Sequence, residues 1–166
     1  GWDWWSDRER GGGLLGALGS HATDSLGLWL GQPRRVFCDL TTFVKEREEK
    51  PVTSDDAYVM IAEFDSGARA IIHMSCVAGV EDSHIGIYGS DGQLVLPGYR
   101  CSDISGGKRT DRKVRDLEIP SRYQLPREPG HFLRSPFRVL TNSLVNAIDR
   151  KLPSPSPNFE DGLASQ

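Results

Sequence analysis

The first periodic segment along the chain has the spacing of an amphipathic α-helix. Between residues 13 and 30 the apolar side chains recur every three or four positions, at Leu14, Leu18, Ala22, Leu26 and Trp29. This spacing places them on one face of a helix, and Gly31 with Pro33 is expected to end it. A second segment with the same spacing follows Ser135-Pro136 and predicts a helix over about 137–151.

Runs rich in β-branched and aromatic residues predict strands between the two helices. They cover 36–44, 55–64, 68–77, 84–88 and 93–96, with a short edge strand over 114–119. Asp65-Ser66-Gly67 and Gly89-Ser90-Asp91-Gly92 have the composition of tight turns between antiparallel strands. The charged segment 45–51 is expected to be a loop. These strands therefore predict an antiparallel meander.

The run 55–64 is apolar on both faces of its predicted strand. Tyr58, Met60 and Phe64 alternate with Val59 and Ile61. Because a sheet with one face in water carries polar residues on that face, this strand is expected to be covered twice. We predict an α+β fold: an open, predominantly antiparallel β-sheet with helices packed on one face and an oligomer interface on the other.

The length and the two ends of the chain bear on its domain organisation. With 166 residues, of which 37% are hydrophobic, the chain predicts one domain, 1–166. The tryptophans of the opening segment need a surface to cover them, so we expect the chain to begin inside a larger protein. Asn158 is a candidate N-cap near the end, and the last helix is expected to be truncated. The long stretch 97–136 is either a mobile lid or an ordered excursion.

Charge, hydropathy and cysteine content exclude several classes of function. The net charge of −3 arises from interspersed signs, so we expect neither nucleic-acid nor membrane-surface binding. The basic cluster at 108–115 is interrupted by Asp111 and is interpreted as a solvated loop rather than a phosphate site. No apolar run approaches the roughly 18 residues of a membrane span. Three separated cysteines, Cys38, Cys76 and Cys101, fit a reducing, cytoplasmic location and lack metal-site spacing.

The segment 11–24, GGGLLGALGSHATD, carries the candidate chemistry. On a uniform helix of roughly 100° per residue, His21 lies just beyond one edge of the apolar face. The core then holds one side of the ring while a nitrogen faces a cleft, as a general acid or base requires. A histidine with only structural hydrogen bonds fits the pattern too. Gly11–Gly13 do not form GxGxxG after a strand, so we expect close packing at the helix entry rather than phosphate binding.

Four segments, in this order, resemble one known family. They are WWSDRERGGGLLGALGSHATDSLGLWLG, VTSDDAYVMIAEFDSGARAIIHMS, IGIYGSDGQLVL and PSPNFEDGLASQ. Over nearly its whole length the chain is similar to the C-terminal domain of the glucose-fructose oxidoreductase, inositol dehydrogenase and MocA-like family (Gfo/Idh/MocA). The resemblance implies an N-terminal Rossmann domain that is absent from these residues. Lys50, in Glu49-Lys50-Pro51, matches the family's catalytic lysine motif only by coincidence, because it closes a charged loop.

The family motif, close to GGGxLxDxGxHxxD, implies site residues at the matching positions. His21 matches a histidine that is catalytic or contacts substrate in many members, and Asp24 matches the final aspartate, a candidate substrate contact. Ala17 replaces the aspartate one helical turn before the histidine, which leaves His21 without a carboxylate to orient it. Trp5, just before the glycines, is a further candidate substrate contact, with a structural role as its alternative.

The resemblance implies the substrate-binding and oligomerisation domain of an NAD(P)-dependent oxidoreductase acting on a sugar, cyclitol or related polyol. Hydride would pass between a secondary alcohol carbon and the nicotinamide, with His21 hydrogen-bonded to the reacting oxygen or its neighbour. NAD or NADP would be bound mainly by the absent domain, and these residues alone are expected to be inactive. The expected partners are the polyol or sugar and further copies of the chain, in a dimer or tetramer through the sheet face. The alternative is a non-catalytic dimerisation or ligand-binding module of the same ancestry, which Ala17 favours.

Overall fold

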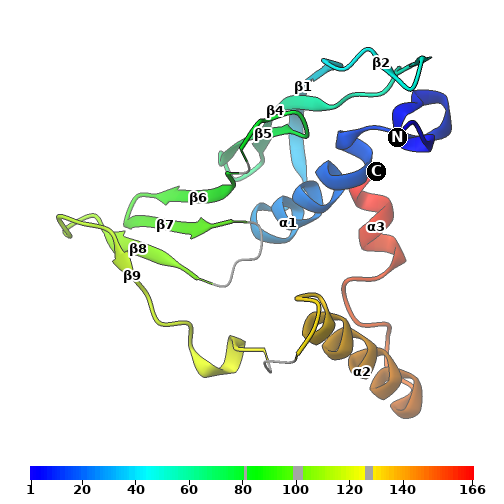
Figure 1. Ribbon diagram of the computed structural model, residues 1–166. Helices are drawn as coiled ribbons and strands as arrows, with labels where there is room; N and C mark the ends of the chain where they lie inside the picture. The colour runs from blue at the N-terminus through cyan, green and yellow to red at the C-terminus, as the bar shows by residue number, and fades with distance from the viewer. Residues whose placement is uncertain (81, 99–102, 126–128) are drawn as a thin grey trace. The chain divides into compact units, whose positions relative to one another are not determined.

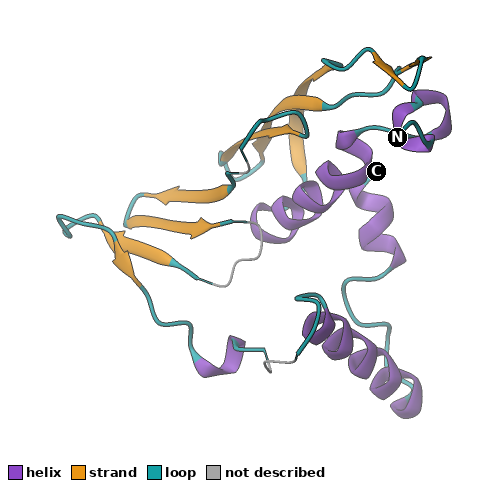
Figure 2. Cartoon of the chain, in the orientation of Figure 1, coloured by secondary structure: helices purple, strands orange, loops and turns teal. Residues whose placement is uncertain are grey.

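Antiparallel strands and a small number of helices make up the protein (Figure 1; Figure 2). The computed structural model describes residues 1–80, 82–98, 103–125 and 129–166. The described residues divide into two compact units, one of residues 1–79 with 156–166 and one of residues 80–155. The predicted α+β class is confirmed, with the described strands paired in three separate antiparallel sheets. In that part of the chain, no helix has the length and apolar character needed to cross a membrane.

The first unit is built on a three-stranded antiparallel sheet. Its strands are β1 (Pro33–Thr41), β4 (Ala57–Phe64) and β5 (Arg69–Ser75), and β4 lies in the centre. Gly67 adopts a φ of +82° in the turn between β4 and β5, a conformation that glycine reaches without steric cost. The strands and the turn predicted over 55–77 are therefore confirmed.

A short hairpin forms where the sequence predicted only a loop. It consists of β2 (Glu46–Arg47) and β3 (Lys50–Pro51). The two turn residues between them, Glu48 and Glu49, adopt a left-handed backbone conformation, with φ of +49° and +59°. Such angles are typical of the turns that join tight hairpins. The hairpin covers Trp2, whose Nε1 donates to the Pro51 carbonyl at 2.9 Å. The Nζ of Lys50 lies 5.2 Å from the centre of the same ring, a cation–π contact.

The predicted first helix begins with a wide turn. Leu15–Gly19 is a π turn, and α1 (Ser20–Leu30) continues from it. The helix predicted over 13–30 is confirmed, but the uniform 100° per residue assumed for it is wrong through 15–19. A π turn adds one residue to the hydrogen-bonded ring, and apolar spacings of three and four residues do not reveal that addition. Two 3-10 turns, Trp4–Ser6 and Arg8–Arg10, precede the glycines.

The last helix of this unit, α3 (Phe159–Ser165), begins at the predicted cap. The Asn158 side chain accepts the backbone N–H groups of Glu160 and Asp161, and the Asp161 carboxylate accepts the Asn158 N–H in return. This reciprocal arrangement is a capping box. α3 packs against α1.

The core of the first unit lies between the sheet and the start of the helix. Leu14, Tyr58 and Met60 are buried together, with Leu15 and Cys38 packed against them. The side chains on the other face of the sheet are exposed to solvent in this chain: Phe37 at 63%, Val59 at 39%, Ile61 at 44% and Ile71 at 75%. Helical cover of one face is therefore confirmed, and the second face is open, with an apolar centre flanked by charged residues such as Arg35 and Glu63.

The second unit contains a four-stranded antiparallel sheet and one long helix. Its strands are β6 (His84–Gly89), β7 (Gly92–Pro97), β8 (Ser105–Lys108) and β9 (Arg115–Asp116), paired in chain order. The predicted hairpin at 84–96 is confirmed. β8 was not predicted, because its Ser-Gly-Gly-Lys sequence lacks β-branched residues.

The stretch 97–136 is structured over much of its described part, which contains β8, β9 and a 3-10 turn, Ser121–Tyr123. Cys101 lies outside the described residues. The helix predicted over 137–151 is confirmed as α2 (Arg134–Arg150), in which only Ser135 and Ala147 are buried.

Candidate functional site

A different structural constraint favours glycine at each position of the triplet Gly11–Gly13. Gly11 adopts a left-handed φ of +78° and ends the second 3-10 turn. A Cβ built on Gly12 would collide with the main-chain oxygens of Trp4 and Trp5. Gly13 has a φ of +123°, and a Cβ on it would collide with the Asp55 carboxylate. The prediction of a tight, closely packed helix entry is confirmed.

The backbone N–H groups at this helix entry already have partners within the chain. Gly11 N–H donates to the main-chain oxygen of Arg8, and Gly12 N–H donates to the main-chain oxygen of Asp7. Leu14 N–H donates to the Asp55 main-chain oxygen at 3.0 Å, and Leu15 N–H donates to Asp55 Oδ2 at 2.8 Å. A carboxylate at a helix N-terminus is stabilised by the partial positive charge there. Asp55 thus occupies the place where a phosphate would bind.

Asp56, next to this cap, fixes the chain after β1. Its two carboxylate oxygens accept the N–H groups of Phe43 and Val44, both at 2.8 Å. Asp55 and Asp56 therefore position the helix and the loop from one point just before β4. Neither was singled out from the sequence; the clue available there was a pair of acidic residues at a strand start, a position that disfavours them.

His21 lies in the first turn of α1 and its side chain is exposed. Its main-chain oxygen accepts the Ser25 hydroxyl at 3.0 Å. Ala17 lies half-buried in the π turn before it. Asp24 is exposed on the same helix, and its Oδ1 accepts the Ser165 hydroxyl of α3 at 3.4 Å. The structure thus brings His21 and Asp24 onto one short helix, and gives Asp24 a contact that joins α1 to α3.

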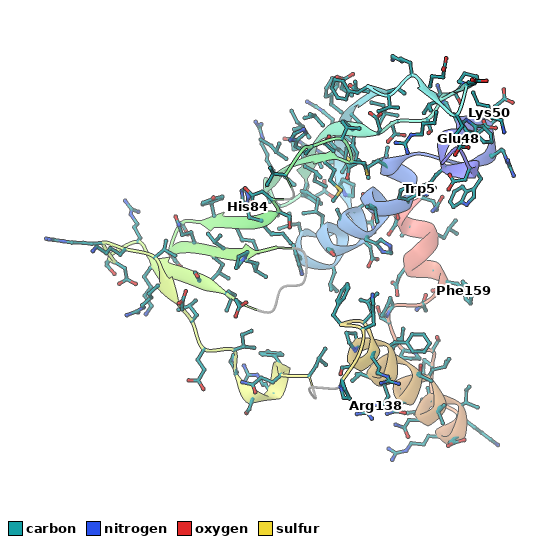
Figure 3. All side chains as sticks on the ribbon, viewed as in Figure 1. Trp5, Glu48, Lys50, His84, Arg138 and Phe159 are labelled. Carbon is teal, nitrogen blue, oxygen red and sulfur yellow. The ribbon has the colours of Figure 1, made fainter. Side chains whose placement is uncertain are left out.

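Trp5 lies in the first 3-10 turn, before the glycines (Figure 3). Its main-chain oxygen accepts the Ser54 hydroxyl at 2.6 Å. The indole ring is 37% exposed and meets the Trp4 ring edge to face, with 6.3 Å between centroids. The backbone is therefore anchored, while part of the ring is open to solvent. Such a ring presents a partly exposed apolar surface.

Tyr58 is a further residue of this region that the sequence did not single out. It is 1% exposed, and its Oη has no hydrogen-bond partner among the described residues. Burial, followed by the nearby Cys38 and Asp55, raises the pKa of Tyr58 to about 12. Burial, followed by Asp55 and Asp39, also raises the pKa of the Cys38 thiol. Both groups are therefore held in the neutral form near pH 7.

The basic cluster of the second unit forms an open surface. A hollow of about 450 Å³ is lined by Thr110, Asp111, Arg112, Lys113 and Arg115. Arg115 pairs with Asp111 at 3.7 Å, and all of these residues are exposed. This is the solvated loop that the sequence predicted. Among the described residues, no three His, Cys, Asp or Glu side chains are grouped so that they hold a metal ion.

Residues 1–95, which include the glycines, His21 and the three-stranded sheet of the first unit, match the family described as the GFO/IDH/MocA C-terminal domain. The chain belongs to this family. One relative of this GFO/IDH/MocA C-terminal domain is an uncharacterised oxidoreductase of Synechocystis, 29% identical over 99% of the chain and 48% of the relative. The chain thus spans about half the length of the curated relative that it matches.

Solved structures give the same fold for the whole chain. An NAD-binding oxidoreductase from Klebsiella pneumoniae matches with a TM-score of 0.79 and 26% identity, over 99% of this chain and 49% of that one. A levoglucosan dehydrogenase in complex with NADH and levoglucosan matches with a TM-score of 0.82 and 21% identity, over 98% and 48%. These neighbours include dehydrogenases that bind NADH.

The glycine triplet of this GFO/IDH/MocA domain does not fit the pyrophosphate of a dinucleotide. In the described part of the chain, the glycine triplet follows a 3-10 turn rather than a strand. The N–H groups of Gly11 and Gly12 are bonded to the main-chain oxygens of Arg8 and Asp7, and those of Leu14 and Leu15 are bonded to Asp55. A dinucleotide pyrophosphate needs free N–H groups at such a turn.

Proposed function

We propose that this chain is the substrate-binding and oligomerisation domain of an NAD(P)-dependent oxidoreductase that acts on a sugar, cyclitol or related polyol. The observation that carries the proposal is His21, exposed on a helix whose start is fixed by Asp55, inside the motif that names the family. The levoglucosan dehydrogenase that shares the fold binds an anhydro sugar and NADH, which supports the substrate class. This chain alone is expected to be inactive.

His21 and its neighbours would act on the substrate rather than on the cofactor. A nicotinamide, when bound, would supply or take up hydride. We propose that an imidazole nitrogen of His21 hydrogen-bonds the reacting hydroxyl oxygen of the polyol and exchanges its proton. Asp24 and the exposed face of Trp5 would contact the remaining hydroxyl groups and the apolar face of the ring.

The open face of the sheet supports the proposed self-association. Phe37, Ile61 and Ile71 are paired across β1, β4 and β5, so they lie side by side on that face. A contiguous exposed apolar patch is typical of an interface. We propose a dimer or tetramer through this surface. A cytoplasmic location stays a prediction from the cysteine content.

A second candidate function is a non-catalytic dimerisation or ligand-binding module. The specific observation in its favour is Ala17, which stands where the family has a carboxylate one turn before His21. Without that carboxylate, the ring of His21 lacks a partner that would orient it. In this alternative a polyol still binds but is not oxidised.

The experiment uses the protein in which this chain is joined to a nucleotide-binding domain. Its melting temperature is measured with a panel of sugars and cyclitols, each with NAD or NADP, and the ligands that stabilise it are then assayed for formation of reduced nicotinamide. A polyol that both raises the melting temperature and is oxidised supports the proposal. Stabilisation without turnover selects the ligand-binding module, and no stabilisation by any polyol contradicts both the oxidoreductase and the ligand-binding module, which leaves only the dimerisation module.

A further inference from the structure

The tip of the Tyr58 ring rests directly on the helix that carries His21. Tyr58 lies on the central strand β4, between Leu40 of β1 and Met74 of β5. A Cβ built on Gly19 would lie 2.8 Å from Tyr58 Oη, 3.1 Å from its Cζ and 2.8 Å from Leu15 Cδ1. Such distances leave no room for a side chain. Glycine is therefore required at position 19, and the strand sets how closely the helix approaches the sheet.

The oxygen of Tyr58 is in an unusual position for a buried hydroxyl. It has no hydrogen-bond partner among the described residues, and an unpartnered buried hydroxyl is costly. A phenylalanine would fill the ring's place without that cost. The oxygen extends the side chain toward the helix: of the ring's atoms, it lies nearest to a Cβ built on Gly19, the last residue of the π turn.

The π turn lies between two fixed points. At its start, Asp55 accepts the N–H groups of Leu14 and Leu15. At its end, Gly19 rests on Tyr58. One extra residue in the turn changes the direction of every later side chain by roughly 100° relative to a uniform α-helix. His21 follows two residues later, so its direction depends on whether the π turn is kept.

We propose that Tyr58 is a positioning residue: its ring tip, lodged beneath Gly19, holds the π turn and thereby sets the direction in which α1 presents His21. The structural part of this proposal stands on the contacts of this chain alone. Its consequence for catalysis rests on the proposed function. The two parts are tested by separate measurements.

The hydrogen-bond register of the helix tests the structural part in this chain. Ser20 N–H bonds to the Leu15 carbonyl, five residues back, and scalar couplings across hydrogen bonds identify that pair by NMR. In Tyr58→Leu we expect Ser20 to bond to Gly16 instead, as in an α-helix. Met60→Leu, in the same buried cluster, is the control and should keep the Leu15 pair. The proposal is overturned if Tyr58→Leu keeps that pair, or if the control loses it as well.

A pair of smaller changes tests the same contact should Tyr58→Leu fail to fold. Gly19→Ala is expected to lower the melting temperature strongly, because its Cβ meets the Tyr58 oxygen. In the Tyr58→Phe background that oxygen is absent while the Leu15 and Cζ contacts remain, so the drop caused by Gly19→Ala should be smaller but not abolished. Equal drops in the two backgrounds would show that the hydroxyl does not bear on the helix at Gly19.

Steady-state kinetics of the protein with its nucleotide-binding domain test the catalytic part. Tyr58→Leu should lower kcat in the enzyme with His21, by up to about 10²-fold, the scale of acid–base catalysis. In the His21→Ala background it should lower kcat no further, because Tyr58 acts through His21. An equal loss in both backgrounds overturns the positioning role. If His21→Ala itself leaves kcat unchanged, the proposed function fails, while the NMR result still decides the register.

Discussion

Replacing Asp55 by alanine tests whether one carboxylate fixes the start of the helix that carries His21. Asp55 Oδ2 accepts the Leu15 N–H at 2.8 Å, and the main-chain oxygen of the same residue accepts the Leu14 N–H. Alanine keeps the main-chain bond and removes the side-chain bond and its charge. Loss of a capping acceptor costs about 1 kcal/mol, and loss of a negative charge at a helix N-terminus costs about 0.5 kcal/mol more.

The expected loss is therefore about 1.5 kcal/mol in the free energy of unfolding. For a chain of this size, this corresponds to a decrease of about 3–6 °C in melting temperature. Asp55→Asn keeps an acceptor oxygen and loses only the charge, so it should cost about 0.5 kcal/mol. Added salt should reduce the difference in stability between the unsubstituted chain and Asp55→Asn, because it screens the interaction of the charge with the helix.

Urea denaturation followed by circular dichroism measures these differences. Asp65→Ala is the matched control, because Asp65 is an exposed carboxylate in the turn between β4 and β5, away from any helix. It should change the free energy of unfolding by less than about 0.5 kcal/mol. If Asp55→Ala is no more destabilising than this control, the account of the helix entry is wrong.

Other changes follow from the same contacts. Gly13→Ala should destabilise the chain because of its φ of +123° and the Asp55 carboxylate, whereas Gly27→Ala, in open space on α1, should stabilise it by about 0.5–1 kcal/mol; opposite signs in urea denaturation check the pair. The pKa of Tyr58 is raised to about 12, so the unfolded phenol ionises first and stability falls as pH rises from about 10 to about 12. Tyr58→Phe should lose less stability over that pH interval than the unsubstituted chain. Equal losses in the two proteins would contradict a raised pKa for the buried Tyr58 phenol. Ile71→Glu, on the open sheet face, should give a monomer in sedimentation analysis, while Val80→Glu, equally exposed, should not; an unchanged assembly in Ile71→Glu argues against this interface.

Local patterns predicted most of the secondary structure. The hairpin at 55–77 was predicted because Asp65-Ser66-Gly67 separates two β-type runs, and the structure has Gly67 at positive φ there. The N-cap of α3 was predicted at Asn158 from local residue type as well, and the structure has a capping box there. β8 was missed because its pairing is decided by its neighbour β7 rather than by its own residues.

The candidate site was only partly predictable. The glycine motif indicated close packing, and it led to His21. The partners that explain the packing are distant in sequence: Asp55 is close to Gly13, and Tyr58 is close to Gly19. A single sequence carries no signal of such pairs. The π turn could not be predicted for a related reason. It occurs where the helix contacts β4, and the periodicity of apolar residues in the helix carries no information about that contact.

The turnover of His21→Ala is the most direct test of the central claim, that this chain supplies the substrate-side chemistry of an oxidoreductase. The variant is compared with His84→Ala, an exposed histidine at the start of β6 (Figure 3), in the protein that includes the nucleotide-binding domain and with a polyol found by the ligand screen. We predict that His21→Ala lowers kcat by about 10²-fold or more, and that His84→Ala leaves it unchanged. Full turnover in His21→Ala would contradict the claim.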